Sequence, residues 1–264
     1  MRIAYRPFDY RFIHYSDFLQ RPQKRVMHHL IKNKNIALAC VRTIGNQKFK
    51  HAGIANTLID KDYISNHTYA FPLYLIDKND SSKLSANFTL QFYKFINDTY
   101  LNQKIKPEEI LGYIYTILYS NKYREKYKEE LKRDFPRIPF VKDYNKFKLL
   151  SKLGEKLIDL HLMNTNFSKN IATFEIDGTN KVEIIRYVND KIYINTSQYF
   201  GGIRKEIQDF EIGNYKVLDR WLKSRKGKIL TAEEIETFIK IVNIFDETIK
   251  IIKEIDDAYS ISVL

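Results

Sequence analysis

Short hydrophobic runs, separated by polar and glycine-bounded segments, characterise the first hundred residues. The run IALACV at 36–41 is continuous and short, as is typical of a buried β-strand. The run YAFPLYLI at 69–76 contains Pro72, which lacks an amide hydrogen, so we expect an edge or bulged strand there. Between them, the polar stretch 43–53 predicts an exposed loop or hairpin. The segment DKNDSSK at 77–83 predicts a long loop, and the whole part is expected to be β-rich and irregular.

Helical spacing of hydrophobic residues dominates the stretch 107–163. A proline followed by two glutamates at 107–109 is typical of a helix start. Ser120-Asn121 predicts a break, after which a charged helix over 123–135 has to stop at the prolines of FPRIP, 135–139. In a third amphipathic helix, five leucines are expected to share one face: Leu149, Leu150, Leu153, Leu157 and Leu160.

Strand patterns return in the second half of the chain, in three segments: 172–176, 182–188 and 191–195. Asn189-Asp190 fits a hairpin turn between the last two. A final helix starts after Thr231, which forms a capping-box pattern with Glu234, and continues to about Asp256. The predicted class is therefore α+β: a β-rich N-terminal part, central helices, a short β-hairpin or sheet and a C-terminal helix.

Length and composition predict a folded chain with a substantial core, since 44% of the 264 residues are hydrophobic. No clear linker divides it, so we expect one domain, 1–264, with a β-rich basic part (1–103) and a helical part with inserted strands (104–264). The single cysteine, Cys40, excludes a disulfide framework and a cysteine-cluster zinc site. Neither a membrane-length hydrophobic run nor a signal-peptide core is present, so a cytoplasmic location is expected.

The formal net charge of +12 is distributed unevenly. Residues 1–51 contain eleven Lys or Arg residues and two Asp residues, a net charge of +9. Residues 232–257 contain three Lys and eight acidic residues, a net charge of −5. A basic segment of this kind favours a polyanionic partner.

Sequence motifs for catalysis are largely missing. The chain contains no phosphate-binding loop, no G-x-S-x-G and no His/Cys set with zinc spacing, so we expect neither a cofactor nor a metal. The adjacent His28 and His29 would point about 100° apart on a helix, which favours a structural or surface role. Glu130-Leu131-Lys132 matches half of a nuclease metal site, but it stands on a charged helix without a preceding acid in a strand.

A nucleic acid is the polyanionic partner that the basic segment favours. Lysine and arginine would neutralise phosphates, whereas Arg, Asn and Gln can read base edges. The polar stretch 42–51 offers this mixture, although an ordinary basic hairpin facing solvent explains it equally well. The predicted DNA contacts are Arg6, Arg11, Arg21, Lys24, Arg25, Arg42, Asn46, Gln47, Lys48, Lys50 and His51.

Several longer motifs resemble one protein family. They are YRPFDYRF (5–12), RPQ (21–23), FPLYL (71–75), the segment 107–139, YINTSQYF (193–200) and the segment 212–242. Together they resemble the C-terminal target-recognition (specificity) domain of Type ISP restriction-modification enzymes and related single-chain endonuclease–methyltransferases. The resemblance covers nearly the whole chain, in order.

The resemblance implies sequence-specific recognition of duplex DNA for an adenine-specific methyltransferase, in partnership with a methyltransferase/nuclease-ATPase polypeptide. The methyltransferase motif [ND]-P-P-[YF] is missing here, so the chain is not expected to be an enzyme by itself. A separate subunit, a split-gene product and a fragment all remain open. Two other functions also remain open: a protein-interaction subunit with a basic docking face, and an unrecognised small nuclease.

Motifs that identify a recognition domain are expected to form its scaffold, because base-reading residues differ between specificities. We therefore expect base readout in the loops 43–51 and 164–181. Trp221 is predicted to be a buried anchor on a helical stripe with Val217, Leu218 and Leu222. The following SRKGK (224–228) would be a turn, at most a phosphate contact.

Overall fold

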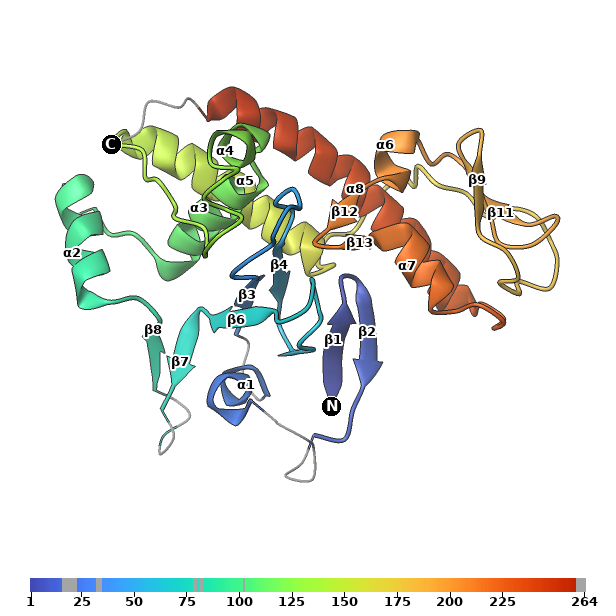
Figure 1. The fold of residues 1–264 in the computed structure, drawn as a ribbon, viewed down its shortest axis with the longest axis horizontal. Coiled ribbons are helices and arrows are strands. Elements are labelled where there is room, and N and C mark those ends of the chain that lie inside the picture. Colours follow the sequence, from blue (N-terminus) through green and yellow to red (C-terminus); the bar gives the residue numbers. More distant parts are fainter. Residues whose placement is uncertain (16–22, 32–34, 78–79, 81–82, 102, 260–264) are drawn as a thin grey trace.

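Small, mostly antiparallel sheets lie below and to the right of a central group of helices in the computed structural model (Figure 1). The structure describes residues 1–15, 23–31, 35–77, 80, 83–101 and 103–259. The expected α+β class is confirmed, with its β-rich N-terminal part, central helices, small C-terminal sheet and long final helix.

Up to Ala86, the described residues of the N-terminal part form three small sheets and one helix. Strand β1 (Arg2–Arg6) pairs with β2 (Asp9–Phe12) and, in parallel, with β5 (Leu58–Ile59). The second sheet has the order β4-β3-β6, with bounds Ala52–Ala55, Ala37–Cys40 and Tyr69–Pro72. The third is a hairpin of β7 (Tyr74–Ile76) and β8 (Leu84–Ala86). Helix α1 (Lys24–Ile31) packs against strands from all three.

Strand predictions in this part are confirmed. The run 36–41 is β3, the central strand of its sheet, and the polar stretch after it connects β3 to β4. The run 69–76 forms two strands, β6 and β7, and Pro72 ends the edge strand β6. The predicted loop 77–83 joins β7 to β8, although part of it lies outside the described residues.

The central helices are α2 (Leu90–Thr99), α3 (Pro107–Tyr119), α4 (Asn121–Lys126) and α5 (Tyr144–His161). Ser120 ends α3 and caps α4, its hydroxyl accepting a hydrogen bond from the Tyr123 amide, which confirms the predicted break. The second helix is shorter than predicted. The residues after Lys126 form turns, in which the Lys132 carbonyl accepts a hydrogen bond from the amide of Ile44, on the β3–β4 connection.

Four of the five leucines expected on one face of α5 are buried, but Leu149 is 50% exposed. Leu149 therefore lies off the buried stripe, which faces α3 and α8. Helices α3 and α5 cross at two glycines, Gly112 and Gly154. A Cβ atom on Gly154 would overlap the Gly112 carbonyl oxygen, so only glycine permits this approach. The Thr116 hydroxyl donates to the Leu150 carbonyl oxygen across the same crossing, at 2.6 Å.

The C-terminal part contains a three-stranded sheet, a short hairpin and three helices. The strands are β9 (Arg186–Val188), β10 (Lys191–Tyr193), β11 (Tyr199–Phe200), β12 (Glu211–Ile212) and β13 (Tyr215–Lys216). The helices are α6 (Lys205–Gln208), α7 (Val217–Lys223) and α8 (Ala232–Ala258). Thr231 and Glu234 form the predicted capping box. Asn189 and Asp190 both have positive φ, as the predicted tight turn requires.

Two strand predictions in this part are wrong in extent. Residues 172–176 form only an isolated bridge between Thr173 and Gly201, because β11 extends no further alongside them. Of the predicted strand 182–188, only the last three residues belong to β9.

The β1–β2 hairpin inserts its tip into the helical core. Phe8 has a φ of 61°, an uncommon conformation for a bulky residue, and its buried ring packs edge-on against His161 and Phe245. The His161 ring also contacts the hydroxyls of Tyr115 (2.7 Å) and Thr248 (3.0 Å). Burial lowers the pKa of His161 to about 3. This histidine is therefore a neutral core residue.

We predict that Gly154→Ala destabilises the fold by about 3 kcal/mol, because a methyl group forces α3 and α5 apart. The control is Lys156→Ala on the exposed face of the same helix, which should change stability by less than about 0.5 kcal/mol. Urea denaturation measures both. Equal stability of Gly154→Ala and the wild type would contradict the tight crossing.

Acid should destabilise the folded chain through His161. Below about pH 6.5 the unfolded chain binds a proton at this histidine, whereas the folded chain does not until about pH 3. The free energy of unfolding should therefore fall through this window as the pH is lowered, by up to about 1.4 kcal/mol per pH unit from this group. Denaturation of His161→Gln at several pH values should show a flatter profile, whereas the exposed His14→Gln should retain the wild-type slope.

Candidate nucleic-acid interface

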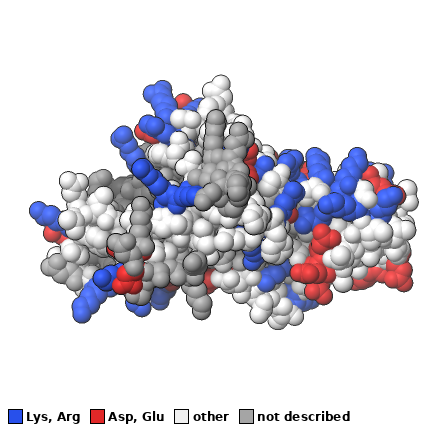
Figure 2. Space-filling view, turned by 90° about the horizontal axis from the view of Figure 1, so that it is seen from below, with Lys and Arg blue, Asp and Glu red and all other residues white. Residues whose placement is uncertain are grey.

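Lysine and arginine side chains form separate groups on the molecular face of Figure 2, with no single continuous basic field. The predicted DNA contacts divide accordingly. Some lie on the β1–β2 hairpin, some on α1 and some on the 41–51 loop that joins β3 to β4. Helix α1 and the 41–51 loop lie at opposite ends of the β3–β4 hairpin (Figure 1). Arg21 lies outside the described residues.

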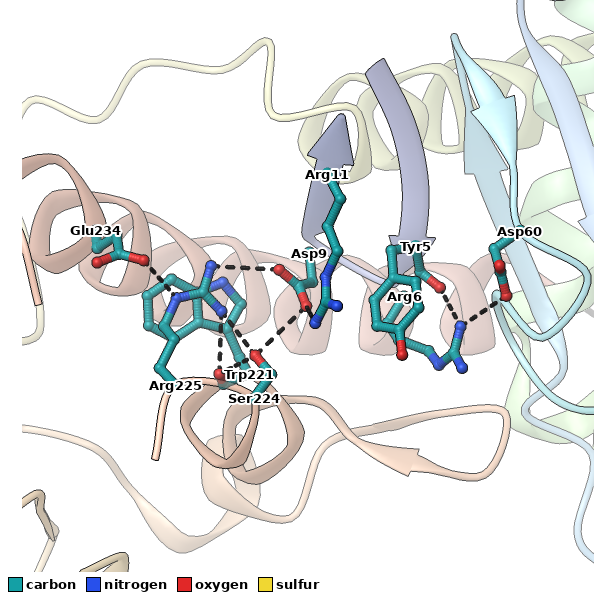
Figure 3. Close-up of polar contacts among 9 residues, drawn as sticks. All are labelled: Tyr5, Arg6, Asp9, Arg11, Asp60, Trp221, Ser224, Arg225 and Glu234. Atoms are coloured by element: carbon teal, nitrogen blue, oxygen red, sulfur yellow. Dashed lines mark hydrogen bonds and ion pairs between the residues drawn. The ribbon is translucent and has the colours of Figure 1, made fainter. Parts of the chain in front are cut away.

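The β1–β2 hairpin is held against the C-terminal helices by Arg225 (Figure 3). Its Nη2 donates to Asp9 Oδ1 at 3.2 Å, and its Nε donates to Glu234 Oε1 at 2.9 Å. The guanidinium stacks on the Trp221 ring, 3.4 Å from the ring centroid, and Nη1 donates to the Trp221 carbonyl and the Ser224 hydroxyl. Arg225 thus joins α7, α8 and the N-terminal hairpin.

The two hairpin arginines that were predicted to contact DNA make internal contacts (Figure 3). Arg6 is buried, and its Nη1 pairs with Asp60 Oδ1 at 2.8 Å. Arg11 is 46% exposed, and its Nη2 lies 3.5 Å from Asp9 Oδ2. Both guanidinium groups lie over the Tyr5 ring, at 4.0 Å and 3.7 Å from its centroid. Arg6 therefore has a structural position, and only Arg11 presents its side chain to solvent.

The base of the 41–51 loop is fixed by the β12–β13 turn. The Lys50 ammonium pairs with Glu211 Oε2 at 2.8 Å, and the Lys50 carbonyl accepts from the Gly213 amide at 2.7 Å. His51 is 1% exposed, and its Nε2 donates to Asn214 Oδ1 at 2.9 Å. Burial lowers the pKa of His51. This residue is therefore a neutral anchor, removed from the surface that a ligand could reach.

The tip of the same loop is exposed. Asn46, Gln47 and Lys48 are all solvent-accessible, and Gly45 starts the turn with a φ of 59° and open space around it. At the start of the loop, the exposed Arg42 pairs through Nε with Asp134 Oδ1 at 2.9 Å. Tip side chains can therefore approach a ligand without disturbing the base.

Helix α1 carries the other predicted cations. Lys24 and Arg25 are exposed at its start, and Arg25 borders an open pocket together with His28, His29 and Lys83. The His29 ring is held in place by β7, since its Nδ1 accepts a hydrogen bond from the Ile76 amide at 2.9 Å. The adjacent histidine rings contact each other, with centroids 3.6 Å apart. Lys83, which the sequence analysis did not select, adds a cation from the neighbouring hairpin.

Trp221 is 1% exposed and packs against Phe238 of α8, which confirms the predicted anchor. The turn prediction for 224–228 is also confirmed. The basic residues of that turn have different environments, however. Arg225 is only 15% exposed and ion-paired, whereas Lys226 and Lys228 are exposed.

A second basic surface lies on the β9–β10–β11 sheet, where sequence reasoning placed no contact. Arg186 and Lys191 lie over the rings of Tyr193 and Tyr199 on its outer face. The alternation of these residues with buried Ile192 and Phe200 is a signal that could have identified the surface.

Among the described residues, no three His, Cys, Asp or Glu side chains gather as metal ligands. No described helix is long and hydrophobic enough to cross a membrane. Glu130 borders a largely aromatic groove beside the 135–139 segment, which contains no described acidic cluster.

The fold is that of a part of Type ISP restriction-modification enzymes. The structure of the enzyme LlaBIII bound to DNA has a TM-score of 0.79 and 19% identity, over 100% of this chain and 18% of that chain. The structure of a DrdV–DNA complex has a TM-score of 0.80 and 22% sequence identity, and the match covers 96% of this chain and 28% of that chain. The structure of a nuclease-deletion mutant of the Type ISP enzyme LlaGI, in complex with a DNA substrate mimic, has a TM-score of 0.74 and 19% sequence identity. This match covers 97% of this chain and 24% of that chain.

The family model for the Type ISP C-terminal specificity domain matches residues 1–254, and the chain belongs to this family. The resemblance that the sequence motifs indicated is therefore confirmed. The chain spans between 18% and 28% of the length of the three solved relatives. Among curated proteins, no sequence matches the chain significantly.

We predict that Asp9→Ala lowers the free energy of unfolding by about 3 kcal/mol, because it removes a buried partner of Arg225. Arg11→Ala is the matched control. It removes a longer, half-exposed contact to the same carboxylate and should cost less than about 1 kcal/mol. Fluorescence of Trp221, the only tryptophan, follows unfolding directly beside the ion pair. Similar losses in the two variants would contradict the central position of Arg225.

Proposed function

We propose that this chain recognises a specific sequence in double-stranded DNA as the specificity part of a restriction-modification enzyme. The observation that carries this proposal is the family match over residues 1–254, together with three solved relatives that are all complexes with DNA or a DNA mimic. The net charge of +12 and the exposed cations of the N-terminal part fit a polyanionic ligand.

The predicted contacts separate into two groups under this proposal. Asn46 and Gln47 carry amides that can form two hydrogen bonds to the major-groove edge of an adenine, at N6 and N7, and they occupy the tip of the 41–51 loop. Lys48 on the same tip, and Lys24 and Arg25 on α1, supply charge for phosphates. Arg6 and His51 support the scaffold on which these residues stand, while Arg42 and Lys50 are already paired with acids.

Catalysis would come from other parts of the parent enzyme. The chain would act by positioning DNA for a methyltransferase/nuclease-ATPase polypeptide, and we propose that polypeptide as its protein partner. In this arrangement, the recognition loop has to be attached rigidly, because its position on the DNA determines which base is presented for modification. The solved relatives, which are several times longer than this chain, support such a division.

Selection from random DNA duplexes should yield one enriched sequence, and titration against it tests the loop. Gln47→Ala or Asn46→Ala should lower the preference for the selected site by about 1–3 kcal/mol while leaving nonspecific affinity unchanged. Lys48→Ala should weaken binding to all duplexes and reduce the salt slope by about 1.

The control is Lys152→Ala on the exposed face of α5, which changes the same charge away from the loop. If all three tip variants match the wild type, the loop assignment is wrong although DNA binding stands. A chain that binds no duplex at low salt, but binds an acidic partner protein, would instead favour the interaction-subunit function. Magnesium-dependent cleavage that is lost in Glu130→Ala would favour the nuclease.

A further inference from the structure

The β9–β10–β11 sheet has two chemically different faces. The register places Arg186 opposite Tyr193, and Tyr193 opposite Tyr199, so these three side chains share one face. Lys191 is two residues before Tyr193 and lies on the same face. The opposite face carries Ile192 and Phe200, both fully buried, and the Phe200 ring packs 4.2 Å from that of Phe238 on α8. The sheet is therefore anchored on one side and open on the other.

Two cations are held in place on the open face by tyrosine rings. The Arg186 guanidinium lies 5.0 Å from the Tyr193 ring centroid, and the Lys191 ammonium lies 4.2 Å from that of Tyr199. The two tyrosine rings contact each other, with centroids 5.1 Å apart. Interaction with the Tyr199 side chain raises the pKa of Lys191. Both cations thus occupy defined positions on the open face.

Neither cation is neutralised by a described acidic side chain. Arg204, Arg225 and Lys50 all pair with carboxylates, whereas Arg186 and Lys191 form no ion pair within the described ranges. Two nearby acidic residues contact other side chains. Glu183 pairs with Lys181, and Asp190 accepts a hydrogen bond from the Tyr187 hydroxyl. In Figure 2, the part of the molecule that contains this sheet, on the right, has most of its Lys and Arg on one edge and most Asp and Glu on the other.

We propose that this face, formed by Arg186, Lys191, Tyr193 and Tyr199, binds the sugar–phosphate backbone of duplex DNA. Two positioned cations and two phenol hydroxyls supply hydrogen-bond donors of the kind that contact phosphate oxygens. The rings are already covered by cations, which favours backbone contact over stacking on an unpaired base. The inference rests on the proposed DNA-binding function and adds a sequence-independent contact to it.

The test is the double variant Arg186→Gln/Lys191→Gln in the whole chain, with Lys152→Gln/Lys156→Gln on α5 as a control of equal charge change. Binding is measured by fluorescence anisotropy on the selected duplex and on a scrambled duplex, at several salt concentrations. The sheet variant should lose at least about tenfold in affinity for both duplexes equally, and its salt slope should fall by about 2. The α5 control should retain the wild-type values.

A sheet variant that binds both duplexes like the wild type overturns the inference while leaving the proposed function intact. A loss confined to the selected duplex also overturns it, because it would show base readout at this face. Failure of the wild type to bind any duplex refutes the proposed function itself, and the inference with it. Tyr193→Phe/Tyr199→Phe retains both rings and should cause a smaller loss, equal on both duplexes. Circular dichroism verifies folding, which should be preserved because Arg186 is exposed and Lys191 is half-buried, and neither belongs to the core.

Discussion

Arg225 connects the beginning of the chain to its end. Its guanidinium stacks on the Trp221 ring and forms ion pairs with Asp9 of the first hairpin and with Glu234. Glu234 also completes the capping box of α8. Helix α7 directly follows the β12–β13 hairpin, whose turn holds the base of the 41–51 loop. The candidate recognition loop is therefore attached to the same C-terminal part of the chain that Arg225 joins to the first hairpin.

The residues of the YRPFDYRF motif make contacts that stabilise the fold. Arg6 pairs with Asp60, Phe8 enters the core and Asp9 pairs with Arg225, while Tyr5 lies beneath two arginines. The formal charge of the N-terminal segment therefore overstates the field available to a polyanion. Acidic residues of the last helix behave similarly, since Asp246 is paired with Arg204 and Lys250. Charge counted along a sequence is a weaker guide than charge left unpaired in the fold.

Features governed by neighbouring residues could be predicted from the sequence. The Ser120 break, the Asn189-Asp190 turn and the Thr231 cap each depend on contacts within a few positions. Features governed by distant residues could not. The Asp60 partner of Arg6 is 54 positions away, and the Asn214 partner of His51 is 163 positions away. The second helix ended early for the same reason, since its extension packs on the β3–β4 connection.

The 41–51 loop has a base that is held by other parts of the fold and a tip that is not. Lys50 and His51 are held by the β12–β13 turn, while the three residues after Gly45 contribute no side-chain hydrogen bond among the described contacts. Selection for stability therefore acts on the base and leaves the tip unconstrained. Under the proposed function, such a loop can diversify rapidly, because a lineage can acquire a new target sequence through tip substitutions without passing through poorly folded intermediates.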